Sequence, residues 1–254
     1  MSKHPKLTVL LFIAMARPTK HDEATREALL DAAETLLATG GPDAVSVRAV
    51  AEKIGVSTRA VYSVFGAKPG LVGALAARGF NRLADLVNAI PTTPDPLADL
   101  AAAGPRGFRV FALEKPHLFR ITYDQISEAV YSQAETYPAL FASFQALEAR
   151  FTRALDAGLL TPRPMVELIF MYHSFCCGLA TNELSAQPPP VGANFWKVAQ
   201  GTDYAALWES ALAALVKGLG TSLGTSPAKA VSPPNQSATK LQSRANSAMA
   251  SRKS

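Results

Sequence analysis

Apolar residues recur every three or four positions along most of the chain, a spacing typical of amphipathic helices. No segment shows the strict alternation expected of a half-buried strand. In the first half, helices are expected at 22–38, 46–54, 57–65 and 69–89. Gly40-Gly41-Pro42 should end the first of them, and prolines at 91–96 follow the last. The pattern therefore predicts an all-α fold.

The second half continues in the same way but with more apolar residues. Helices are expected at 97–113, 116–133, 137–157, 163–184 and 203–220. Gly104-Pro105 should disturb the middle of the first of these helices. A proline-rich loop is expected at 186–201, and 222–254 lacks periodicity and is expected to be disordered.

Composition supports a folded protein with a large core. Hydrophobic residues make up 48% of the 254-residue chain, which excludes an intrinsically disordered protein. The expected organisation is an N-terminal extension (1–15), a first helical domain (16–66), a connecting helix (67–90), a C-terminal domain (91–221) and a basic tail (222–254).

The first fifteen residues carry a short apolar run after two lysines. The run is too short to span a bilayer, and no small-residue cleavage site follows it. We interpret it as a disordered extension or as the product of a start codon upstream of Met15, with a membrane anchor as the alternative. The only cysteines, Cys176 and Cys177, are adjacent and offer no disulfide framework, which favours a cytoplasmic protein without a membrane partner.

The net charge of +5 says little by itself, because the tail 222–254 holds five basic residues and no acidic one. A local block is more informative. Between 48 and 82 the only acidic residue is Glu52, against Arg48, Lys53, Arg59, Lys68, Arg78 and Arg82. Such a block is the electrostatic footprint expected of a nucleic-acid-binding segment.

Residues 46–71 meet the local requirements of a helix-turn-helix. The two helices cross closely, and Ala51 is small enough to allow this. The tight turn needs a residue that tolerates positive φ, and Gly55 follows four residues later. Ser46 and Ser57 are preferred N-cap residues. The positions that should be buried are apolar: Val50, Ile54, Val56, Val61 and Val64.

The second of these helices leaves small and polar side chains for its outer face. Arg59 can pair with guanine, and the methyl groups of Thr58 or Ala60 can contact thymine in a major groove. The Tyr62 hydroxyl and Lys68, at the start of the next helix, suit phosphate contacts. Without these polar elements, the same pattern would be typical of a plain helical hairpin.

Residues 20–75 resemble the N-terminal domain of the tetracycline-repressor (TetR) family of bacterial regulators. The matching positions are Ser46, Ala51, Gly55-Val56-Ser57, Val61-Tyr62, Phe65, Lys68 and Leu71. Ser63 and Val64 depart from the larger polar or aromatic residues that are frequent in the family. The resemblance implies a three-helix, helix-turn-helix DNA-binding domain followed by a helical ligand-binding and dimerisation domain.

The resemblance also implies partners. A homodimer would place two recognition helices in successive major grooves of a pseudo-palindromic double-stranded operator. The expected DNA contacts are Arg17, Ser46, Val47, Arg48, Ser57, Thr58, Arg59, Ala60, Tyr62 and Lys68. Arg17 lies ahead of the first helix and is equally typical of a solvated tail. Helices 163–184 and 203–220 could pack against their copies as a four-helix bundle.

In the C-terminal domain, the resemblance implies a cavity for a small effector. The candidate lining residues are Phe108, Phe111, Phe119, Tyr123, Phe144, His173 and Cys177. The alternative is that these side chains simply fill the core. His173 and Cys177 are one helical turn apart, but two ligands without a third do not make a metal site. We expect no metal and no cofactor.

The function indicated is a sequence-specific transcriptional repressor that a small hydrophobic ligand releases from its operator. One alternative is a DNA-binding regulator without an effector, acting as an activator or architectural factor. Another is an enzyme built on His173 and Cys177, which the sequence disfavours. It has no third activating group, no Gly-rich phosphate loop and no paired carboxylates.

Overall fold

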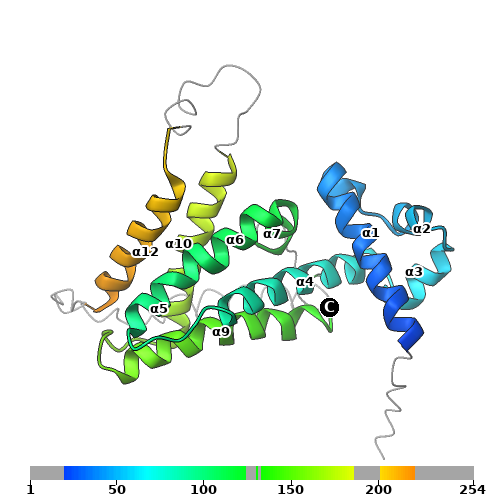
Figure 1. The fold of residues 1–254 in the computed structure, drawn as a ribbon. Helices are drawn as coiled ribbons and strands as arrows, with labels where there is room; N and C mark the ends of the chain where they lie inside the picture. The colour runs from blue at the N-terminus through cyan, green and yellow to red at the C-terminus, as the bar shows by residue number, and fades with distance from the viewer. Residues whose placement is uncertain (1–19, 124–129, 131–132, 186–200, 221–254) are drawn as a thin grey trace, which may run out of the picture. The chain divides into compact units, whose positions relative to one another are not determined.

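The computed structural model describes residues 20–123, 130, 133–185 and 201–220, and no strand occurs among them. Figure 1 shows helices joined by turns, which confirms the all-α prediction. Residues 1–15, the tail 222–254 and nearly all of the predicted loop 186–201 lie outside the described residues.

The helices of the N-terminal half lie where the sequence predicts them. They are α1 (Lys20–Ala44), α2 (Val47–Ile54), α3 (Thr58–Phe65) and α4 (Lys68–Asn88). The predicted stop after residue 38 appears as a break inside α1, because Gly41 has a φ of 70° and ψ of −170°. The residues after it form a short separate turn of helix.

The C-terminal half contains α5 (Pro96–Ala103), the π-helical turn η1 (Gly104–Phe108), α6 (Arg109–Glu114), α7 (Pro116–Tyr123), α9 (Thr136–Asp156), α10 (Met165–Ser185) and α12 (Tyr204–Gly220). The predicted helix 97–113 is thus three pieces. Pro105 has no N–H to donate and crowds the preceding turn, and the chain takes a π turn at this point. The predicted helix 116–133 is described only as far as Tyr123, apart from Val130.

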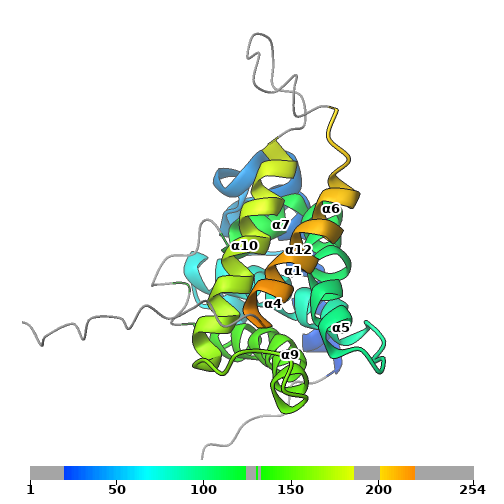
Figure 2. The same ribbon diagram turned by 90° about the vertical axis from the view of Figure 1, so that its left-hand side faces the viewer.

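The long helix α4 runs beside α9, while α1 to α3 lie around its N-terminal end (Figure 1), and in the turned view α10 and α12 lie in front of α4 (Figure 2). One continuous cluster of buried apolar side chains extends from Leu29 in α1 to Leu219 in α12. The helix-turn-helix and the C-terminal helices are therefore joined through a shared core, and α4 is the element common to both.

Arg150 of α9 fixes the C-terminal end of α4. It is only 7% exposed, and its guanidinium donates to the carbonyl oxygens of Val87 (2.5 Å) and Ile90 (2.9 Å) and to that of Asp99 (3.2 Å). The last carbonyls of a helix lack partners within the helix and are costly to bury alone. Arg150 supplies those partners and carries positive charge at the negative end of the helix dipole.

The Asp99 carboxylate holds the loop between α4 and α5. It accepts hydrogen bonds from Arg153 Nη1 (2.6 Å), Thr93 N (2.8 Å) and Thr93 Oγ1 (2.7 Å). Burial alone would raise the pKa of this carboxyl group. The hydrogen bonds from Arg153 and Thr93 outweigh burial and lower its pKa to about 2.

We expect Asp99→Asn to lower the free energy of unfolding by about 2 kcal/mol at pH 7, because the folded pKa lies below that of an unfolded Asp. This contribution is complete above the unfolded pKa and disappears as the pH falls towards 2. Urea unfolding at pH 7, 5 and 3 measures it, with the exposed Asp156→Asn as control. An equal loss at pH 7 and pH 3 would contradict the assignment.

Gly79 lets α7 approach α4 closely. A Cβ at this position would lie 2.0 Å from Thr122 Oγ1 and 3.3 Å from Phe111 Cζ. A second contact lies near the N-terminal end of α4, where Thr136 Oγ1 donates to the Gly73 carbonyl (3.1 Å). The spacing of α7 and α9 from α4 therefore depends on glycines in α4.

Gly79→Ala should destabilise the protein by roughly 1–3 kcal/mol through overpacking, although alanine is the better helix former. Thr122→Ala removes the clashing hydroxyl, so the double variant should regain most of the loss. Urea unfolding of the two single variants and the double variant measures this coupling. Additive losses would mean that the two side chains do not meet.

Candidate functional site: a helix-turn-helix and an aromatic cluster

Local hydrogen bonds set the angle between α2 and α3. Ser46 Oγ accepts from Ala49 N (3.1 Å) and caps α2. Gly55 ends α2 in the left-handed region with φ 71° and ψ 31°, and Val56 N donates back to the Ala51 carbonyl (3.0 Å). This is the usual way in which a glycine closes a helix, and the sequence signals identify it in advance.

The α3 helix begins at a second cap and divides its side chains between core and solvent. Ser57 Oγ accepts from Ala60 N (3.3 Å). Val61 and Phe65 are buried, whereas Thr58 and Arg59 are exposed. The Tyr62 side chain is 52% exposed, which is unusual for a tyrosine in a packed helix. One side of α3 is thus free to meet another molecule.

The residues expected to contact DNA do not all share this exposure. Exposed positions are Arg48, Ser57, Thr58, Arg59, Tyr62 and Lys68, and partly exposed ones are Ser46 and Ala60. Val47 lies in the core of the helix-turn-helix, so its side chain is not available as a contact. Arg17 lies outside the described residues. Lys68 is the first residue of α4, beside the unpaired N–H groups of that helix end.

Two members of the basic block turn out to have internal partners. Arg78 pairs with Glu27 (2.6 Å), Asp31 (2.7 Å) and Glu34 (3.0 Å), all on α1. Arg82 pairs with Glu114 (2.5 Å). In the sequence, Arg78 and Arg82 count toward the basic block in the same way as Arg48 and Arg59. Their acidic partners are far away in the sequence, so the local count could not reveal these pairs.

Phe108, Phe111, Phe119, Tyr123, Phe144 and His173 meet in one place, which we call the aromatic cluster. Tyr123 is at its centre: its ring lies 4.9 Å from His173, 5.1 Å from Phe119, 6.3 Å from Phe108 and 6.4 Å from Phe111. Phe144 lies parallel to the His173 imidazole at 6.4 Å. The candidate pocket residues of α6, α7, α9 and α10 are therefore neighbours in space.

Two further aromatic side chains contact this cluster, and the sequence analysis did not predict them as pocket residues. Phe80 of α4 lies edge-on to Tyr123 at 5.6 Å, and Tyr172 of α10 lies 6.2 Å from Phe108. Tyr172 donates to the Leu100 carbonyl at 2.7 Å. Both are core positions on their helices, and only the spacing along α4 and α10 could have suggested them.

The space left beside the aromatic cluster is small. A cavity bounded by Leu83, Phe108, Tyr123, Phe144 and His173, among others, has a volume of about 10 Å³. This is close to the least that a water molecule needs. A ligand of several atoms would therefore have to displace a side chain.

His173 and Cys177 face each other within α10. Cys177 Sγ lies 3.6 Å from Nε2 and 3.8 Å from Nδ1 of the ring. Burial lowers the pKa of His173 to about 4, so the imidazole is neutral at physiological pH. Among the described residues, no three His, Cys, Asp or Glu side chains are grouped so that they could hold a metal ion.

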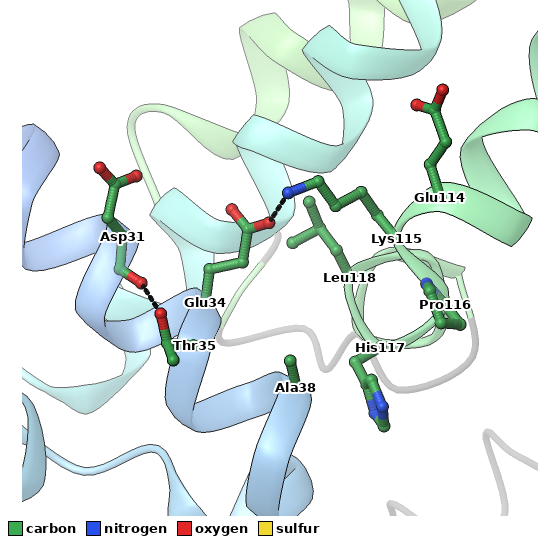
Figure 3. A pocket seen from close by; sticks show the side chains of 9 residues that line it. All are labelled: Asp31, Glu34, Thr35, Ala38, Glu114, Lys115, Pro116, His117 and Leu118. Atoms are coloured by element: carbon green, nitrogen blue, oxygen red, sulfur yellow. Dashed lines mark hydrogen bonds and ion pairs between the residues drawn. The ribbon is translucent and has the colours of Figure 1, made fainter.

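A polar groove of about 440 Å³ separates α1 from the turn between α6 and α7 (Figure 3). Lys115 Nζ reaches across it to Glu34 Oε1 (2.6 Å). Burial would raise the pKa of the Glu34 carboxyl group, but hydrogen bonds from Lys115 and Arg78 lower it below its ordinary value. Glu34 therefore links α1 to both α4 and the α6–α7 turn by charge.

Within the described residues, no single helix is long and apolar enough to cross a membrane. The α3–α4 pair meets that criterion only as two helices bent by 62°.

Comparison with known proteins shows what this chain is similar to. Residues 29–75 match the family model for bacterial regulatory proteins of the tetR family. A solved structure of a protein of unknown function from Rhodococcus sp. RHA1 is 24% identical, with a TM-score of 0.63, covering 77% of this chain and 95% of that chain. A structure assigned to the tetR family of transcription regulators, from Shewanella sp. PV-4, is 18% identical, with a TM-score of 0.58, covering 76% of this chain and 96% of that one.

The structure of RolR in complex with resorcinol is 17% identical, with a TM-score of 0.50, covering 79% of this chain and 95% of that chain. No curated protein sequence matches the chain. At these identities the solved structures establish the shared fold. The match to the tetR family model lies on the helix-turn-helix itself, so over residues 29–75 the chain is similar to bacterial transcription regulators of that family.

Proposed function

We propose that this protein is a transcriptional regulator: a homodimeric repressor, bound to a pseudo-palindromic operator and released from it by a small uncharged ligand. The observation that carries the DNA-binding part is the exposed side of α3, where Thr58, Arg59 and Tyr62 surround the Ser57 cap. In this proposal, α3 enters the major groove of DNA in the cytoplasm and reads base edges through Arg59 and Thr58.

Phosphate contacts would come from both sides of α3. Lys68 brings a charge to the N-terminal end of α4, and Arg48 is exposed on α2. Ser46 and Ser57 use an oxygen lone pair to accept a backbone N–H, which leaves each hydroxyl hydrogen for a phosphate oxygen. These contacts would hold the register of the protein on DNA without reading its sequence.

We assign a separate role to each of the predicted domains. Residues 16–66 bind DNA, 67–90 connect, and 91–221 bind the effector and the second subunit. Exposed apolar side chains on α10 and α12 support a dimer contact there: Val166, Phe170, Met171, Phe175 and Leu207. Exposed apolar residues gathered on one helix often mark a subunit interface, and a twofold dimer would place α10 and α12 against their copies.

The aromatic cluster is the proposed effector site. It touches α4 through Leu83 and Phe80, and α7 through Tyr123. A ligand that enlarges the cluster would shift α7 against α4 and α1, and so turn the DNA-binding helices. The resorcinol bound by RolR supports the idea that this fold can hold a small aromatic molecule.

A second candidate is a DNA-binding regulator without an effector. The cavity of about 10 Å³ favours it, because a well-filled core needs no ligand. Operator binding measured with and without candidate effectors separates the two proposals. Release at a saturable ligand concentration supports the repressor, and unchanged binding across a broad panel of small molecules supports the second candidate.

Arg59→Ala should weaken binding to the operator by about 1–3 kcal/mol and relax the preference at one base position. Fluorescence anisotropy with operator and scrambled DNA measures both effects, once footprinting of the upstream DNA has located the operator. Arg120→Ala, an exposed arginine on α7, is the matched control. A loss of equal size on scrambled DNA would count against base reading by Arg59.

Lys115→Met should weaken operator binding by about fivefold at low salt, since the pair with Glu34 restrains the orientation of α1. Binding to scrambled DNA should not change, because Lys115 is assigned no phosphate contact. Lys217→Met on α12, also an exposed lysine, controls for the lost charge. Identical operator affinities of wild type and Lys115→Met would exclude a restraint at this groove.

A further inference from the structure

His173 is an unusual member of an apolar cluster. Its ring lies 4.9 Å from Tyr123 and 5.7 Å from Phe108, and parallel to Phe144. Burial keeps it neutral at physiological pH. A neutral imidazole carries one hydrogen-bond donor and one acceptor. The contact described for both of its nitrogens is the Cys177 thiol, a weak partner in either role.

The cavity beside His173 is lined by uncharged side chains. The cavity is bounded by Leu83, Phe108, Tyr123, Leu140, Ser143, Phe144, Leu147, Ile169 and His173. None of these side chains is charged at neutral pH. A carboxylate or ammonium group placed there would lose its hydration without gaining an ion pair, which costs far more than burying a hydroxyl group.

Phe144 is the wall that can move. Phe108, Phe111 and Phe119 are fully buried, whereas Phe144 is half-buried and contacts the exposed Phe170 at 6.1 Å. Its ring lies 6.4 Å from the His173 imidazole with the two planes 25° apart, so it fills the space beside the imidazole that another flat ring would take. A side chain at the edge of the core can leave at a lower cost than one enclosed on all sides.

We propose that the aromatic cluster binds a neutral, flat aromatic molecule that bears a hydroxyl group, takes the place of the Phe144 ring and hydrogen-bonds to His173. The proposal rests on the effector role of the cluster proposed above and specifies the chemical class of the ligand. The hydroxyl donates to the unprotonated nitrogen of the imidazole, and the ring lies in the enlarged cavity that Phe108, Tyr123 and His173 line.

The test uses phenol, toluene and benzoate as probes of the full-length chain by titration calorimetry. Phe144→Ala removes the displaced ring and should bind phenol more tightly than wild type does. Adding His173→Leu should weaken phenol by roughly tenfold and leave toluene within about threefold. Benzoate should not bind to any of these proteins. Phe141→Ala, an exposed phenylalanine on the same helix, should bind phenol as wild type does.

The proposed ligand class is wrong if the affinity for phenol is the same with and without His173→Leu, or if benzoate binds as tightly as phenol. If Phe144→Ala does not fold, Phe144→Leu and the rise in wild-type melting temperature with phenol give the same comparison. Operator release is measured separately. Phenol binding without release would refute the effector role alone, and release by other molecules without phenol binding would refute the ligand class alone.

Discussion

The buried guanidinium of Arg150 is the contact on which the geometry of the C-terminal half depends. Burial lowers its pKa, yet it stays charged because the ordinary value is so high. It binds the Val87 and Ile90 carbonyls, and so holds the end of α4 against α9. Asp99 of α5 binds Thr93 of the loop that follows α4 and Arg153 of α9. This end of α4 is therefore firmly anchored.

The opposite end of α4 is held differently. The middle of the helix is restrained by the close contact of Gly79 with Thr122 and by the charges of Arg78 with α1, and nearer the N-terminus Thr136 donates to the Gly73 carbonyl. The groove beside Glu34 is open, and surface ion pairs contribute little each. The N-terminal end of α4, where Leu71 and Leu75 are buried, shares its core with the helices that carry the proposed DNA-reading surface.

The sequence predicts the helix-turn-helix almost to the residue and the rest of the chain only as a series of helices. Ser46, Gly55 and Ser57 act on neighbouring backbone groups, so their effect is visible in a short window. Arg150 acts on carbonyls sixty residues away, and Gly79 matters because of Thr122. Such pairings depend on how the helices pack. For the same reason, Val47 resembles a surface contact in the sequence and lies in the core.

Two polar side chains on α10, Glu183 and His173, differ in how fully they are hydrogen-bonded. The Glu183 carboxylate receives Arg109 in a forked pair (2.8–3.1 Å) and Trp208 Nε1 (2.8 Å), and so joins α6, α10 and α12. A fully satisfied group of this kind resists change, because each lost bond leaves a buried charge exposed to an apolar surrounding. His173, ten residues earlier, is neutral and has a thiol as its neighbour. A ligand that bonds to it displaces only a weak contact, so the core can change at His173 while Glu183 keeps the helices together.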